Sequence, residues 1–85
     1  MASTTVTVGS SIGLHARPAN VIADAVTAAG VPVTLALVGG EPVEANSALM
    51  IMTLGAGFGT PVVITSDDQP TLNKVAELVA SDLDA

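Results

Sequence analysis

The pattern of hydrophobic and polar residues predicts four short strands, the first of which alternates strictly with a period of two. In that first strand we expect Val6 and Val8 on the buried side. Residues 60–65 form the most β-branched stretch of the chain and should be a central strand. Pro42 has no amide hydrogen to donate to a neighbour, so its strand should lie at an edge. The predicted strands are residues 5–8, 33–37, 41–45 and 60–65.

A period close to 3.6 residues predicts a long amphipathic helix over residues 16–29. Pro18 fits its first turn, where a missing amide hydrogen costs nothing. Gly30, followed by Val-Pro, is a stop signal. The residues expected on the buried face of this helix are Ala19, Ile22, Ala23, Val26 and Ala29.

Two more helices are predicted in the second half of the chain. Ser47 can cap a short helix that Gly55 ends, and either Asp67 or Asp68 can cap the last helix. Pro70 then lies in the first turn of that last helix. Its expected buried stripe consists of Leu72, Val75, Ala76, Val79 and Leu83.

The resulting order of elements is β-α-β-β-α-β-α over one domain, residues 1–85. An α+β fold, with a four-stranded antiparallel sheet covered on one face by helices, is the economical packing for this order. A chain of 85 residues has room for one core and leaves no space for a deep substrate cavity. We therefore expect a protein that presents a surface to partners and acts as a monomer.

The charge balance and the residue types exclude several classes of function. The formal net charge is −6 and the only cations are Arg17 and Lys74, which argues against binding nucleic acid or anionic membranes. The sequence has neither a bilayer-spanning apolar run nor the pattern of a signal peptide, so we expect a cytoplasmic protein. The chain has no cysteine and one histidine, which excludes disulfides, thiol chemistry and Cys/His zinc sites. We expect no metal and no cofactor.

The single histidine, His15, lies at the junction between a loop and the first helix. Unpaired amides and the positive end of the helix dipole meet there, and this field favours a neutral, nucleophilic imidazole. Arg17 follows two residues later, although a cation in the first turn opposes the dipole. A guanidinium beside backbone amides and an imidazole makes a plausible cradle for a phosphoryl group. The simpler interpretation is that His15 caps the helix and Arg17 is solvated.

Residues 13–19, Gly-Leu-His-Ala-Arg-Pro-Ala, closely resemble the active-site motif of the HPr family, the histidine-containing phosphocarriers of the bacterial phosphotransferase system. Residues 46–55 resemble the regulatory-serine segment of that family, and the length and the element order match its open-faced β-sandwich. The resemblance implies a phosphoryl-transfer intermediate in sugar transport and not an independent turnover enzyme.

The resemblance also implies a role for each residue of the motif. His15 would accept a phosphoryl group on Nδ1 from phosphorylated enzyme I, with phosphoenolpyruvate as the ultimate donor, and pass it to the IIA component of a sugar permease. Arg17 would hold the phosphoryl oxygens, together with the backbone amides of Ala16 and Arg17. Pro18 has no amide hydrogen, so these two amides are the available donors.

The sequence departs from the family around the expected docking face. Ile12 stands where the family commonly has a polar residue, and Asp24 and Met50 occupy a region where it often has lysines. We therefore expect partner docking to depend on apolar contacts. Ile51 and Leu54 should share an inward face. The candidates for the exposed docking residues are Leu49, Met50 and Met52.

Two further segments have competing interpretations. The resemblance implies that Ser47 is a site of regulatory phosphorylation by a serine kinase, which would add charge beside the docking face. Serine is also a common N-cap, which is the simpler role. Residues 55–60, Gly-Ala-Gly-Phe-Gly-Thr, superficially resemble a nucleotide-binding loop, but they lead into a strand and no Gly-Lys-Ser/Thr follows. We interpret them as a turn.

Two alternative functions stay open. One is a regulatory paralogue that serves a nitrogen-related phosphorelay. The other is an inert interaction module in which His15 is only a cap. The identity of the phosphoryl donor separates the first alternative from sugar transport, and a failure to be phosphorylated by any enzyme I would favour the second.

Overall fold

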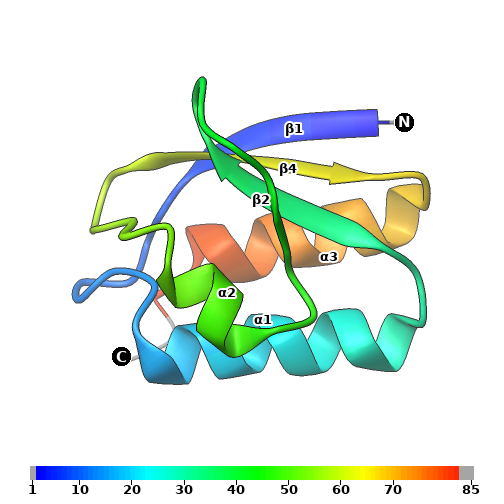
Figure 1. Ribbon diagram of the computed structural model, residues 1–85, viewed down its shortest axis with the longest axis horizontal. Helices are drawn as coiled ribbons and strands as arrows, with labels where there is room; N and C mark the ends of the chain where they lie inside the picture. Colours follow the sequence, from blue (N-terminus) through cyan, green and yellow to red (C-terminus); the bar gives the residue numbers. More distant parts are fainter. Residues whose placement is uncertain (1, 83–85) are drawn as a thin grey trace.

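A computed structural model describes residues 2–82 and shows one sheet with three helices on one of its faces (Figure 1). The strands pair antiparallel throughout, in the order β1-β4-β2-β3. This arrangement confirms the predicted α+β open-faced sandwich and the predicted order of elements. The elements are β1 (Ala2–Thr7), α1 (Ala16–Ala29), β2 (Val33–Leu37), β3 (Val43–Glu44), α2 (Ala48–Met52), β4 (Pro61–Ser66) and α3 (Gln69–Ala80).

The central strand is β4, as the β-branched pattern predicts, with β1 on one side and β2 on the other. Its inward residues Val62 and Ile64 are fully buried, and Ile64 is paired with Leu35 of β2. The edge position of the strand predicted over residues 41–45 is also confirmed, but the observed strand β3 is shorter than expected. It comprises two residues because Pro42 cannot donate and stays outside the ladder.

The core lies between the sheet and the helices and consists of aliphatic side chains. The predicted stripes of α1 and α3 are confirmed at most positions, and Ala76 is partly buried against the core. Ala29 is exposed, contrary to expectation, because it is the last residue of α1, where the chain turns at Gly30. Leu83, the last member of the predicted α3 stripe, lies outside the described residues. The buried members of the stripes are Ala19, Ile22, Ala23, Val26, Leu72, Val75 and Val79.

The helix ends follow the local signals in the sequence. Gly30 closes α1 in the left-handed conformation (φ 71°), and its amide donates to the carbonyls of Val26 and Thr27, each at 3.2 Å. Of the two candidate aspartates, Asp68 caps α3, and Ser47 caps α2 by accepting from the Met50 amide at 3.3 Å. Among the helices of residues 2–82, none has the length and hydropathy needed to cross a bilayer.

Candidate functional site

His15 is the N-cap of α1, and its side chain is exposed to solvent. Its backbone is extended (φ −81°, ψ −167°), and its carbonyl accepts the first hydrogen bond of the helix, from the Ala19 amide at 2.9 Å. The imidazole makes no capping hydrogen bond. Within residues 2–82 the ring has no hydrogen-bond partner, so its nitrogens face solvent at the start of the helix.

The residues just before His15 are fixed by a second loop. Leu14 is buried, and its amide donates to the carbonyl of Ala56 at 2.9 Å. Gly13 has a φ of +80°, and a Cβ on it would lie 2.6 Å from the Ala56 carbonyl oxygen and 2.9 Å from the Cα of Gly57. Only glycine fits this conformation and this close approach. The exposed histidine therefore follows directly on a buried, hydrogen-bonded anchor.

Arg17 and two free amides share the first turn of α1 with His15. Helical hydrogen bonds begin at the Ala19 amide, and Pro18 has no amide hydrogen. The amides of Ala16 and Arg17 are therefore left without a partner inside the helix. Both residues are exposed, and no ion pair joins the Arg17 side chain to the described part of the chain.

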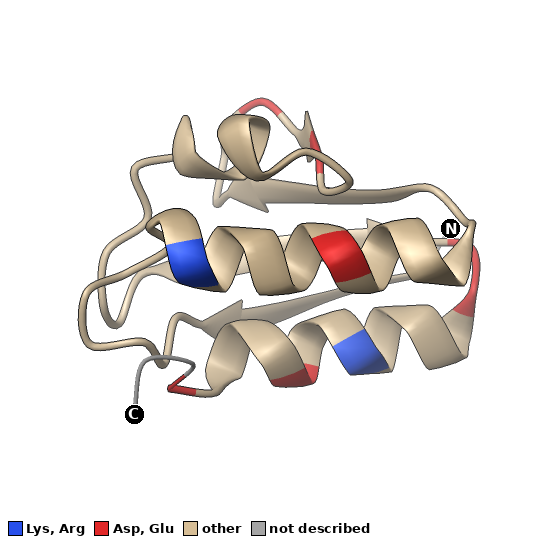
Figure 2. Cartoon of the chain, turned by 90° about the horizontal axis from the view of Figure 1, so that it is seen from below, with Lys and Arg blue, Asp and Glu red and all other residues tan. Residues whose placement is uncertain are grey.

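The two cations of the chain lie on different helices. Arg17 belongs to the first turn of α1, whereas Lys74 lies on α3, and Figure 2 shows these two basic positions in blue. Only Arg17 therefore adds positive charge to the turn that carries the histidine. A nucleophilic ring, two amide donors and a guanidinium in one turn form a site suited to a tetrahedral oxyanion such as a phosphoryl group.

Helix α2 packs against α1 and carries the predicted docking residues. Leu49 and Met50 are exposed, by 71% and 40% respectively. Met52 is instead half-buried and packs against the core, so its expected exposure is wrong. The reason is that Met52 is the last residue of a five-residue helix, next to the fully buried Ile51.

The loop between α2 and β4 contributes to the site in a way that the sequence interpretation missed. It forms a turn, as expected, but the carbonyl of Ala56 in this loop also holds Leu14 in place. Phe58 in the same loop is 69% exposed. A signal was present in the sequence, because an aromatic residue between two glycines in a turn has few neighbours to pack against.

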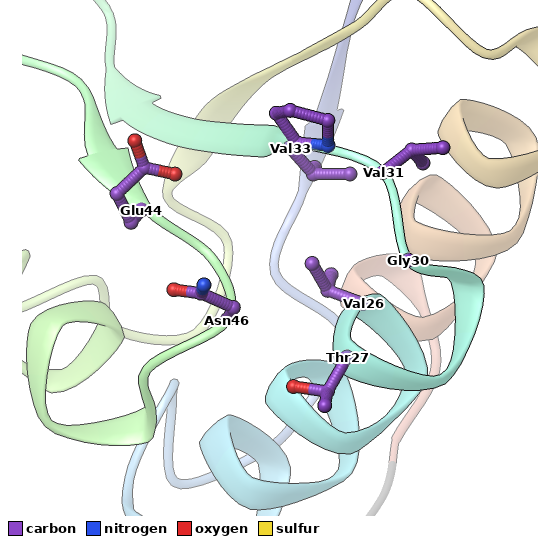
Figure 3. A pocket seen from close by; sticks show the side chains of 8 residues that line it. Val26, Thr27, Gly30, Val31, Val33, Glu44 and Asn46 are labelled. Carbon is purple, nitrogen blue, oxygen red and sulfur yellow. The ribbon is translucent and has the colours of Figure 1, made fainter.

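The hollow in Figure 3 lies at the other end of α1, around Gly30 and the start of β2. It has a volume of about 480 Å³, with Val26 and Val33 among its lining residues. The Thr27 hydroxyl and the Glu44 carboxylate do not converge on a common point (Figure 3). Residues 2–82 also contain no group of three or more His, Cys, Asp or Glu side chains that could hold a metal ion.

Comparisons with known proteins show the family to which the chain belongs. A family model described as the PTS HPr component phosphorylation site matches residues 2–81. The phosphocarrier protein HPr of Streptomyces coelicolor is 46% identical over 87 residues, covering 99% of this chain and 94% of the relative. The crystal structure of a phosphocarrier protein HPr from Bacillus anthracis superposes with a TM-score of 0.84 at 27% identity, covering 92% of this chain and 95% of the other. The structure of HPr-C-His from Thermoanaerobacter tengcongensis shares the fold, with a TM-score of 0.77 at 23% identity, covering 94% of this chain and 96% of that one.

A helix-covered open sheet with a histidine at the start of its first helix is the architecture of a phosphocarrier. The chain belongs to the HPr family, the phosphocarriers of the phosphotransferase system.

Proposed function

We propose that His15 accepts a phosphoryl group from phosphorylated enzyme I, with phosphoenolpyruvate as the ultimate donor, and passes it to the IIA component of a sugar permease. The observation that carries this proposal is the uncapped start of α1. There the exposed ring of His15 lies in the same turn as Arg17 and two amides without helical partners. Membership of the HPr family supports the same direction of transfer.

The proposed reaction requires one chemical step from this chain, the exchange of a phosphoryl group between two histidine nitrogens. In the forward step a bond forms between Nδ1 of His15 and phosphorus, while the bond from phosphorus to the donor's histidine nitrogen breaks. Such an in-line exchange needs positioning and neutralisation of the phosphoryl charge, and little else. Arg17 and the amides of Ala16 and Arg17 are the groups of this chain that would neutralise that charge.

The remaining parts of the proposal concern the partners. Leu49 and Met50, exposed on α2 beside α1, would contact enzyme I and the IIA component. Ser47 caps α2 through its hydroxyl, and phosphorylation of that hydroxyl by a serine kinase would place negative charge beside the docking residues of α2. The domain would do this work in the cytoplasm as a monomer without a cofactor.

Incubation with enzyme I and phosphoenolpyruvate, followed by intact mass measurement, tests the acceptor. We expect one acid-labile, base-stable phosphoryl group on the wild-type chain and none on His15→Ala. Ser47→Ala is the control variant. A phosphoserine is not acid-labile, so the acid-labile group does not depend on Ser47, and this variant should be phosphorylated like the wild type. Acid-labile phosphorylation of a folded His15→Ala variant would overturn the assignment. Phosphorylation only by the donor of a nitrogen-related relay would favour the regulatory alternative.

A further inference from the structure

The one aromatic residue of the chain, Phe58, is on the surface and not in the core. It is 69% exposed, in the loop between α2 and β4. A buried phenylalanine contributes more apolar area than the valine, isoleucine and alanine side chains that fill most of this core. Folding stability alone therefore does not explain a phenylalanine at this position.

The loop that carries Phe58 is held on both sides of it. Before it, Ala56 is buried, and its carbonyl accepts from Leu14 at 2.9 Å. After it, the Gly59 amide donates to the carbonyl of Val8 at 2.9 Å, and the Thr60 amide donates to the carbonyl of Gly57 at 3.1 Å. Phe58 is therefore exposed in a loop whose backbone is held by hydrogen bonds on both sides of it.

These contacts also place the loop beside the phosphorylation site. Leu14 immediately precedes His15, and Ala56, its hydrogen-bond partner, lies two residues before Phe58. The loop before α1 and the loop before β4 lie at the same end of the molecule (Figure 1). Ile12, in the first of these loops, is also exposed, by 54%. Two exposed apolar residues, Ile12 and Phe58, therefore lie in the two loops that the Leu14–Ala56 hydrogen bond joins next to His15.

We propose that Phe58 is a docking anchor that inserts into an apolar cleft on the phosphoryl donor, enzyme I; this inference rests on the proposed function. A donor that reaches His15 has to cover this end of the molecule. Attraction between charges offers little affinity, because Arg17 is the only cation of α1 and the formal net charge is −6. Aromatic side chains in desolvated clefts are frequent hot spots of such interfaces.

Steady-state phosphorylation by enzyme I tests the anchor, with the carrier as the varied substrate. Phe58→Ala should raise the KM for the carrier about tenfold while leaving kcat nearly unchanged, because the lost contact holds the partner and not the reacting atoms. Phe58→Leu should recover much of the affinity. The matched control is Val38→Ala, which removes an apolar side chain that is 68% exposed in the turn after β2, and it should leave KM unchanged. Thermal unfolding of all three variants should match the wild type.

The outcomes separate this inference from the proposed function. If the wild-type chain takes up no phosphoryl group, the proposed function fails first. If the wild type is phosphorylated and Phe58→Ala behaves like Val38→Ala, the function stands and the anchor is wrong. A KM effect confined to transfer onto the IIA component would overturn the assignment of the anchor to the donor.

Discussion

The N-termini of α1 and α3 have similar backbones but differ in side-chain capping. Each begins at an extended N-cap residue and has a proline in its first turn. In α3, the Asp68 carboxylate accepts from both the amide and the hydroxyl of Thr71, the amide at 3.1 Å. In α1, the His15 ring makes no capping bond, and Arg17 places a positive charge at the positive end of the dipole.

The difference shows that the two helices are fixed in different ways. At the start of α3 the Asp68 side chain satisfies the Thr71 amide, whereas the start of α1 is positioned by the Leu14–Ala56 hydrogen bond of the preceding loop. An N-cap side chain contributes about 1 kcal/mol, and α1 forgoes that contribution. Its first-turn amides are consequently available for an external anion, which is what a phosphoryl carrier needs.

Arg17→Ala should have the largest effect on function of the changes at the open end of α1 that keep the acceptor histidine. We expect phosphoryl transfer to slow by roughly 10²-fold, because a charge-assisted donor to the transferring group is lost. Folding stability should stay unchanged, since the exposed Arg17 side chain is not part of the core. Rapid-quench measurement of transfer from enzyme I checks the rate. Lys74→Ala, which removes the cation of α3, is the control and should transfer normally. An unaffected Arg17→Ala variant would show that the amides alone suffice.

Local signals explain why much of this architecture is predictable from the sequence. The bounds of α1 agree with the prediction because Pro18 and Gly30 act within their own turns. The central position of β4 agrees because the β-branched run of residues 60–65 suits a strand that pairs with a neighbouring strand on each side. The chemistry proposed for the site is suggested by His15 and Arg17, which lie two residues apart in the chain.

The features that escaped prediction depend on contacts between distant segments. The Leu14–Ala56 hydrogen bond joins backbone atoms, which every residue has, so side-chain patterns contain no record of it. The burial of Met52 was missed because a helix of five residues is too short for its period to indicate a face. The helical period places Ala29 on the buried face of α1, but Ala29 is exposed because the helix ends at this residue.

Gly13→Ala tests whether the start of α1 depends on the neighbouring loop. The new Cβ would sit 2.6 Å from the Ala56 carbonyl oxygen, in a backbone with φ +80°. We expect a loss of about 2–3 kcal/mol in the free energy of unfolding, from the backbone strain and the displaced loop together. Gly59→Ala is the matched control, because its φ is +79° and no atom lies within 4 Å of its Cβ. It should lose only about 1 kcal/mol. Urea unfolding measures both, and equal losses would mean that the loop contact is unimportant.

His15→Asp converts the open end of α1 into the kind of end that α3 has, and its effect on the free energy of unfolding should be smaller than that of Gly13→Ala. An aspartate at the N-cap accepts from the first-turn amides and interacts favourably with the helix dipole. We therefore expect the free energy of unfolding to rise by about 0.5–1 kcal/mol, while acid-labile phosphorylation disappears. Asp68→Ala is the reciprocal change and should lower it by about 1 kcal/mol without impairing phosphorylation, since it leaves Thr71 without its cap. Urea unfolding with equal m-values would make the two changes comparable. A His15→Asp variant no more stable than the wild type would show that the α1 amides are not free to be capped, and the phosphoryl cradle would then lack its backbone donors.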